Sequence, residues 1–220
     1  MSEQATAGPL SGRRAEAARN DERILDAARE VFLADPEAPI STVATRAAVG
    51  ISALYRRYPS KKELLRALAA DGLTRYIADL EEALASDAEP WAAYVECLNR
   101  VVEGRSQALA QRLAGTFTPT QELTELARRA GQLAETLFRR VRRSGELRED
   151  VTAADIVLLL EMVTLVELPG ANDGAALRRR YLALLLQALR NPVDARLPGP
   201  PARQADLAAR WRSRPAQAAD

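Results

Sequence analysis

The chain has 220 residues, enough for one sizeable core or for a small module attached to a larger domain. It is 47% hydrophobic but only 5% aromatic, and its abundance of Ala, Leu, Arg and Glu predicts an all-α protein. A net charge of +1 does not by itself indicate a nucleic-acid partner, and one cysteine with no histidine removes internal disulfides, most zinc sites and the commonest general base. We therefore expect no catalytic residue, no metal and no cofactor.

Composition changes along the chain predict four segments. Residues 1–20 lack an apolar stripe and read as a flexible basic arm, and residues 192–220, with repeated Pro, Ala and Arg, read as a flexible C-terminal tail. Residues 21–68 and 69–191 carry helical periodicity and are predicted to form a small and a larger helical domain. No apolar run approaches the roughly 20 residues that a bilayer requires, which predicts a cytoplasmic protein.

Three short helices are predicted in the small domain. The first runs from about Asp21 to Leu33 and ends before Pro36. The second begins near Ser41 and Thr42 and ends around Ala48, and the third covers residues 51–58 after a turn of three residues. Two short helices separated by so short a turn form a helix-turn-helix. Its core is expected to pair the small Ala44 on the second helix with the large Leu54 on the third.

Positive charge gathers on this motif. Between Ile40 and Arg66 a single acid, Glu63, is set against six basic residues. The basic residues are Arg46, Arg56, Arg57, Lys61, Lys62 and Arg66. Such a local excess is the electrostatic pattern that contact with a phosphate backbone requires.

The same stretch resembles the TetR family of transcriptional regulators. The residues that carry the resemblance are Ala47, Val49, Leu54, Tyr55, Arg56, Arg57, Tyr58, Pro59, Ser60 and Lys61. The stretch departs from the family pattern at two positions. Ala48 replaces the usual turn glycine, which costs about 1 kcal/mol if its φ is positive, with Gly50 as an alternative site for the turn. Ala53 replaces a residue that is often polar, so it offers only a methyl contact to a base.

The resemblance implies a three-helix, helix-turn-helix DNA-binding head joined to a larger helical domain for ligand binding and dimerisation. It implies a homodimer, usually a repressor, that binds a palindromic operator on double-stranded DNA and is released by a small, largely apolar effector. In this picture Tyr55 and Lys61 hold phosphates, while Ser52 and Arg56 read bases, with Arg57 as a further candidate. The DNA-contacting residues expected are Ser41, Thr42, Ile51, Ser52, Ala53, Tyr55, Arg56, Arg57 and Lys61.

Six helices are expected after the head. Ser60 and Glu63 form a capping box for a long helix that ends near Ser86. Pro90 lies in the first turn of the next helix. The remaining helices are predicted at residues 106–114, 120–143, 152–168 and 175–190. Four arginines near the end of the 120–143 helix are interpreted as a solvated helix terminus that complements the macrodipole; they are Arg139, Arg140, Arg142 and Arg143.

We expect the effector to bind among the helices of the larger domain, in contact with Trp91, Tyr94, Phe117, Phe138 and Glu161. Glu161 is a carboxylate in an otherwise apolar helix, so it either orients the ligand or pairs with an arginine such as Arg179. The last two helices carry more apolar residues than one buried face needs. They form either a two-fold subunit interface or part of the monomer core.

A helical protein-interaction module whose basic head binds an acidic partner is the alternative to a regulator. An enzyme is disfavoured because the chain has no histidine, no paired carboxylates at a fixed spacing and no phosphate-binding loop.

Overall fold

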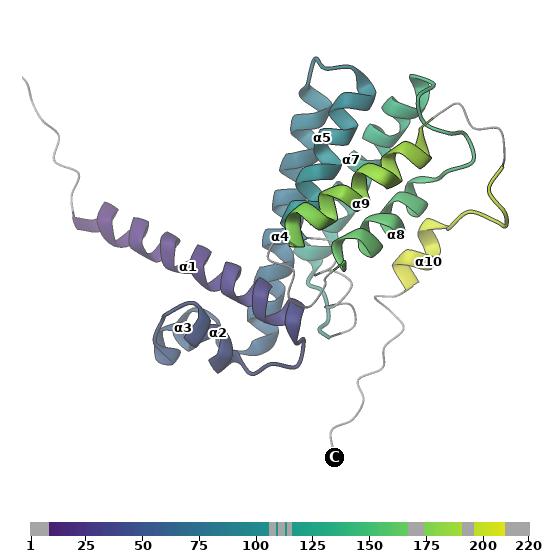
Figure 1. The fold of residues 1–220 in the computed structure, drawn as a ribbon. Helices are drawn as coiled ribbons and strands as arrows, with labels where there is room; N and C mark the ends of the chain where they lie inside the picture. The colour runs from purple at the N-terminus through teal and green to yellow at the C-terminus, as the bar shows by residue number, and fades with distance from the viewer. Residues whose placement is uncertain are drawn as a thin grey trace, which may run out of the picture. The chain divides into compact units, whose positions relative to one another are not determined.

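The computed structural model describes residues 9–105, 109, 113, 116–166, 174–190 and 196–209, and the predicted all-α fold is confirmed (Figure 1). The helices are α1 (Pro9–Ala34), α2 (Ile40–Arg46), α3 (Ile51–Arg57), α4 (Lys61–Ala85), α5 (Pro90–Gly104), α7 (Gln121–Arg143), α8 (Ala153–Thr164), α9 (Gly174–Leu189) and α10 (Gln204–Ala209). Extended pairing in these described segments is limited to an isolated antiparallel bridge between Leu147 and Arg190. Most of the helix predicted at 106–114 lies outside the described residues.

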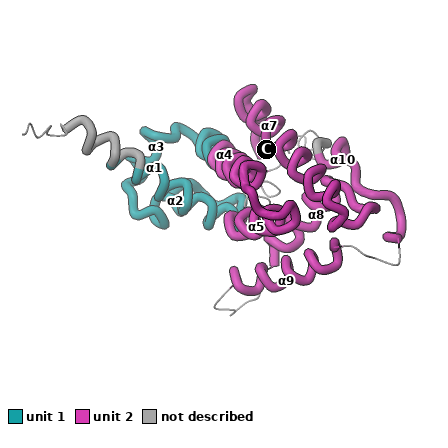
Figure 2. Tube along the Cα trace, turned by 90° about the horizontal axis from the view of Figure 1, so that it is seen from above, with its two compact units in different colours: residues 1–68 teal, residues 69–220 magenta. Residues whose placement is uncertain are grey.

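The chain divides into two compact units, which Figure 2 shows in different colours. The first, residues 1–68, is called the head, and the second, residues 69–220, the body. The division falls where the sequence predicts the end of the small domain. None of the described helices is long and apolar enough to cross a membrane.

The head packs α1, α2 and α3 around one small core. Leu54 is fully buried, and Val43 and Ala44 on α2 are buried with it. Phe32 supplies the large aromatic side chain from α1. The predicted combination of a small residue on the second helix with a large one on the third is confirmed.

The predicted start of the first helix at Asp21 is wrong, because α1 already begins at Pro9. Residues 9–20 lack an apolar stripe, yet they are rich in Ala, Arg and Glu, which have high helix propensity. Extending an existing helix avoids a second nucleation cost, so these residues continue the helix that Ile24 and Phe32 anchor. Only residues 1–8 of the predicted flexible arm lie outside the described residues.

The turn between α2 and α3 has the backbone strain anticipated from the sequence. Ala48 adopts a φ of 52°, whereas Gly50 is extended at φ −65°. The Arg23 guanidinium, from α1, donates to the carbonyl oxygens of Ala47 at 2.6 Å and Ala48 at 3.4 Å. An arginine on α1 thus satisfies carbonyl groups at the end of α2 and holds the turn in place.

Replacing Ala48 by glycine should therefore stabilise the head. Glycine reaches positive φ without a Cβ clash, so Ala48→Gly is expected to raise the free energy of unfolding by up to about 1 kcal/mol. Ala53→Gly is the matched control, because Ala53 is equally exposed but lies inside α3. It should lower stability by about 1 kcal/mol. Urea denaturation of both variants tests this, and two changes of the same sign would contradict it.

The body core lies among α4, α5, α7, α8 and α9. Its fully buried side chains include Leu137, Leu160 and Leu182. Cys97 belongs to the same core, and its burial raises the pKa of the thiol to about 12. At neutral pH the thiol is therefore protonated and behaves as a small apolar group, as the sequence predicts.

Two of the arginines near the end of α7 donate hydrogen bonds to backbone carbonyl groups of other segments, in addition to any interaction with the helix dipole. Arg140 donates to the carbonyl oxygens of Ala83 (3.3 Å) and Leu84 (3.0 Å) at the end of α4, and to those of Ser86 and Ala88 just beyond it. Arg142 donates to the carbonyl oxygens of Glu149 and Val151. The interpretation of this cluster as solvated is thus wrong for Arg140 and Arg142, which tie α7 to neighbouring segments of the body.

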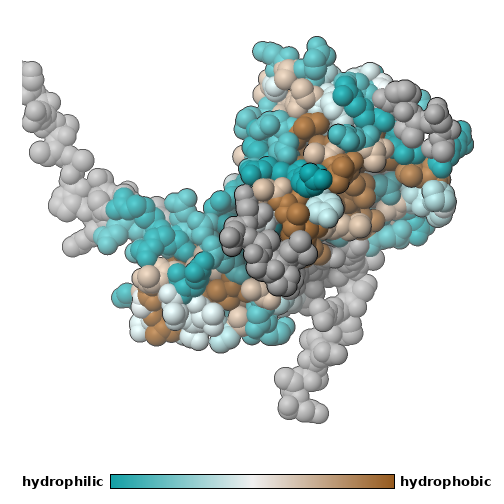
Figure 3. Space-filling view, in the orientation of Figure 1, coloured by the Kyte–Doolittle hydropathy of each residue, from teal (hydrophilic) through white to brown (hydrophobic). Residues whose placement is uncertain are grey.

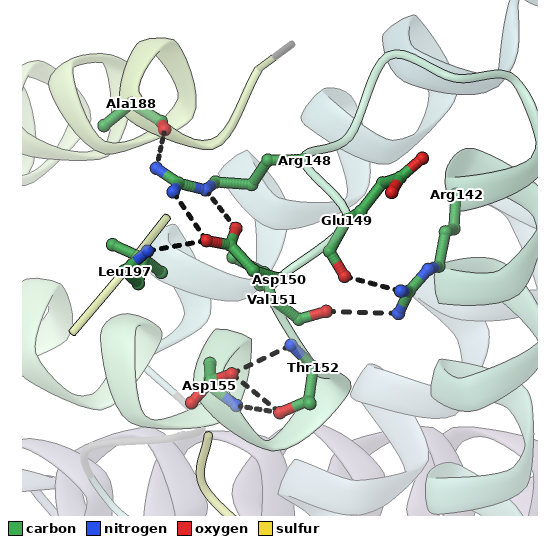
Figure 4. Close-up of polar contacts among 9 residues, drawn as sticks. All are labelled: Arg142, Arg148, Glu149, Asp150, Val151, Thr152, Asp155, Ala188 and Leu197. Atoms are coloured by element: carbon green, nitrogen blue, oxygen red, sulfur yellow. Dashed lines mark hydrogen bonds and ion pairs between the residues drawn. The ribbon is translucent and has the colours of Figure 1, made fainter. Parts of the chain in front are cut away.

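The segment from Arg196 to Ala209, called the C-terminal strap, is held by hydrogen bonds to other parts of the body (Figure 4). The backbone amide of Leu197 donates to Asp150 at 2.7 Å, and that of Ala202 donates to Asp155 at 2.9 Å. Asp150 also accepts two hydrogen bonds from Arg148. The prediction of a flexible tail from residue 192 is therefore wrong for the strap.

The capping box that opens α8 forms one end of this network. Thr152 accepts from the Asp155 amide, and Asp155 accepts in return from the Thr152 amide. The second oxygen of the same carboxylate is the one that holds Ala202. One side chain thus caps α8 and anchors the strap.

Acid should weaken the strap. Hydrogen bonds from Arg148 and Leu197 lower the pKa of Asp150. Partial burial raises the pKa of Asp155, but hydrogen bonds from Ala202 and Thr152 outweigh burial and lower it overall. A carboxyl with a depressed folded pKa stabilises the protein above its unfolded pKa of about 3.9, and this contribution disappears as the pH falls through the folded pKa.

We accordingly expect Asp155→Asn to reduce the melting temperature at pH 7, with a deficit that shrinks once the pH drops below about 4. Thermal unfolding of both proteins from pH 7 to pH 2.5 measures this deficit. Asp87→Asn, at an exposed position, should show no such change. A deficit that widens on acidification would contradict the assignment.

Candidate nucleic-acid interface

The predicted DNA-contacting residues lie on the surface of the head. Ser41 and Thr42 are exposed in the first turn of α2. The five predicted on α3 other than Tyr55 are exposed as well; they are Ile51, Ser52, Ala53, Arg56 and Arg57. Tyr55 is 46% exposed, so it is not a packed core aromatic. The third helix therefore presents a polar and basic outer face over a buried Leu54.

Lys61 lies at the first residue of α4 and is half-buried. Its ammonium nitrogen lies 5.3 Å from the centre of the Phe32 ring, where cation–π attraction orients it. Ser60 accepts a hydrogen bond from the Glu63 amide at 3.2 Å, as one half of the predicted capping box requires. The side chain of Glu63 accepts from Arg66 at 2.5 Å. A cation beside a helix N-terminus is a suitable environment for a phosphate.

Three of the six cations in the motif form ion pairs within the head. Arg66 pairs with Glu63, and Arg46 pairs with Glu30 of α1. Arg57 pairs with Asp21, its Nε lying 2.7 Å from both carboxylate oxygens. Its guanidinium also lies 5.2 Å from the Tyr58 ring centre, and the hydrogen bond with Asp21 raises the pKa of Arg57. The charge count from sequence thus overstates how many cations are available to DNA.

Sequence reasoning missed the residues of α1 that position the other two helices. Asp21 holds α3 through Arg57, Arg23 holds the turn, and Glu30 holds α2 through Arg46. These partners are 16 to 36 residues apart in the chain, so no local pattern indicates them.

Sequence comparison covers both units. Residues 24–68 match the family described as "Bacterial regulatory proteins, tetR family", and residues 88–191 match "Transcriptional regulator SbtR-like, C-terminal domain". The chain belongs to the TetR family of transcriptional regulators. TetR-family membership places it among regulatory proteins rather than enzymes.

A TetR-family relative is the HTH-type transcriptional repressor LfrR of Mycolicibacterium smegmatis. It is 40% identical over 88 residues, which is 40% of this chain and 44% of that protein, so the match spans less than half of either sequence. A solved TetR regulatory protein from Mycobacterium vanbaalenii is 27% identical, with a TM-score of 0.54 over 81% of this chain and 99% of that one. LfrR in complex with proflavine has the same fold, at 23% identity and a TM-score of 0.55 over 76% and 96% of the two chains.

The body holds a small cavity of about 30 Å³. Of the five residues predicted to hold an effector, Tyr94 and Phe138 line it. The remaining lining residues are Tyr76, Leu80, Cys97, Leu98, Ala134, Leu137, Ala153, Ile156, Val157 and Leu160. Burial raises the pKa of both tyrosines, so their hydroxyl groups stay protonated. Among the residues that the structure describes, no carboxylate and no basic side chain lines the cavity.

The other three predicted effector residues lie outside this lining. Trp91 packs against Tyr94, with ring centres 6.4 Å apart, and lies under the Arg190 guanidinium. Phe117 and Glu161 are buried elsewhere in the body. Arg179, the example given for an arginine partner of Glu161, pairs with Glu103 at 3.1 Å.

Proposed function

We propose that this TetR-family protein is a ligand-responsive transcriptional repressor that binds a palindromic operator as a homodimer. The observation that carries the proposal is the head, where a buried Leu54 and a strained, arginine-held turn present the outer face of α3 to solvent. Tyr55 and Lys61 are assigned to phosphates on either side of the groove. LfrR, which matches 40% of this chain, is named a transcriptional repressor, and this supports repression rather than activation.

An exposed apolar face on the body supports a dimer. Met162 on α8, Leu165 just after it, and Tyr181 and Leu184 on α9 are exposed, Met162 to 67% and Leu184 to 52%. Figure 3 shows apolar residues gathered on the side of the body where α8 and α9 lie in Figure 1. A contiguous apolar face of two helices is suited to pair with its own copy around a two-fold axis. In a dimer of this kind the two recognition helices reach successive major grooves, about 34–36 Å apart.

The effector site is assigned to the body cavity. At about 30 Å³ the cavity has room for about one water molecule, far below the roughly 300–1,000 Å³ of a drug-sized ligand site. An effector therefore has to select a state of the body in which the cavity is larger, and by doing so shifts the population away from the DNA-binding state. The apolar lining favours a small, largely apolar molecule. The proflavine complex of LfrR makes that dye a practical first probe.

Gel-shift competition with DNA flanking the protein's own gene tests the repressor proposal. Specific binding should weaken steeply with salt and should be lost in Tyr55→Ala and in Lys61→Ala. Arg128→Ala, at an exposed position on α7 of the body, is the matched control and should bind as the parent does. No DNA binding at low salt would contradict the proposal and favour the protein-interaction module.

A further inference from the structure

We propose that Arg56 is the base-reading arginine of α3, that each operator half-site presents a guanine to it, and that Arg57 is a positioning residue only. This inference rests on the proposed function, because it names which feature of the DNA the head selects. It also separates two adjacent arginines that the sequence alone does not distinguish.

The helical position of each side chain on α3 supports the separation. Successive residues are rotated by about 100°, so Ser52 and Arg56 lie about 160° from Leu54. Leu54 is fully buried, and the face opposite to it is therefore the outermost face of α3. Arg57 lies only about 60° from Leu54, on the flank of the helix. Of the two arginines, Arg56 is the one that points into a groove occupied by α3.

The contacts of the two side chains agree with their positions. Arg57 donates from Nε to both oxygens of Asp21, and a second ion-pair contact joins its terminal nitrogen to Asp21 at 2.7 Å. Its guanidinium also lies over the Tyr58 ring. Arg56 is exposed and forms no ion pair with any of the described residues. Its donors are therefore available to a ligand, whereas those of Arg57 fix α3 against α1.

The chemistry of the free guanidinium identifies the base. Two parallel N–H donors match O6 and N7 of guanine in the major groove, the commonest specific contact of arginine with DNA. Ser52 lies one turn before Arg56 on the same face and accepts or donates to either kind of base, so it adds little discrimination. Arg56 is the only basic residue on the outermost face of the described α3, so it selects a single guanine in each half-site.

The test is selection of bound duplexes from a randomised library by the full-length protein, followed by affinity measurements on the selected site. Parent protein should select half-sites with a guanine at one position, and changing that base should weaken binding on the order of 5- to 150-fold. Arg56→Ala should lose the preference at that position and keep it elsewhere. Arg56→Lys should retain the salt dependence but not the preference, because lysine has the charge without the paired donors.

Arg57→Ala and Asp21→Asn are the paired controls. Both disrupt the contact that positions α3, so they should weaken binding to all sequences similarly and leave the guanine preference in place. The inference is overturned if Arg56→Ala selects the parent motif, or if Arg57→Ala loses the guanine preference. If the parent protein selects no motif at all, the repressor proposal is overturned together with the Arg56 inference. If it selects a motif that does not depend on Arg56, only the Arg56 inference is overturned.

Discussion

Leu184→Glu is expected to convert the protein to a monomer and to lower its operator affinity by at least about 100-fold. The side chain is 52% exposed on the apolar face of α8 and α9, so a carboxylate there should fold normally but would be buried, unpaired, in a dimer. Losing the dimer removes the second half-site contact, and such linkage contributes about 10²- to 10⁴-fold to binding. Analytical ultracentrifugation measures the first effect and gel shift the second.

Leu197→Glu is the matched control for the dimer prediction. Leu197 is exposed to 48%, but it lies in the C-terminal strap, where its contribution to the network is a backbone amide. This variant should remain dimeric and bind the operator. If Leu184→Glu stays dimeric, the face of α8 and α9 is not the subunit interface.

Leu54→Ala should unfold the head and leave the body folded. Truncating a fully buried leucine costs about 2–5 kcal/mol, and a unit as small as the head has little more stability than that. Calorimetry should show the head transition shifted down or lost, with the body transition unchanged and operator binding abolished.

Leu182→Ala is the converse variant, because Leu182 is equally buried in the body core. It should lower the body transition and spare that of the head. A single cooperative transition that moves by the same amount in both variants would contradict independent folding of the two units.

The features predicted correctly from sequence depend on neighbours within about four residues. Leu54 belongs to a helical stripe, Ser60 caps the residue three positions later, and Thr152 with Asp155 opens α8. Turn strain at Ala48 follows from a missing glycine at a position whose backbone geometry the motif fixes. In each case the responsible physical effect acts along the chain and leaves a short pattern.

The features that were missed depend on contacts between distant segments. Nothing near Arg57 shows that it pairs with Asp21, and nothing near Arg140 shows that it holds carbonyl groups at the end of α4. The start of α1 at Pro9 is not indicated by an apolar stripe, because residues 9–20 have none. These residues are helical because their helix propensity is high and the helix that follows them is already anchored. The lining of the body cavity likewise depends on how α4, α5, α7 and α8 meet, which no local pattern indicates.

The C-terminal strap has a practical consequence for where the body can be cut. Similarity to the family ends at residue 191, and a fragment trimmed to that limit would still contain all of α9. It would nevertheless leave Asp150 and Asp155 without the amides of Leu197 and Ala202 and would expose the end of α8 that they cover. We therefore expect an excised body to be more stable if it keeps the C-terminal strap through α10, which ends at Ala209.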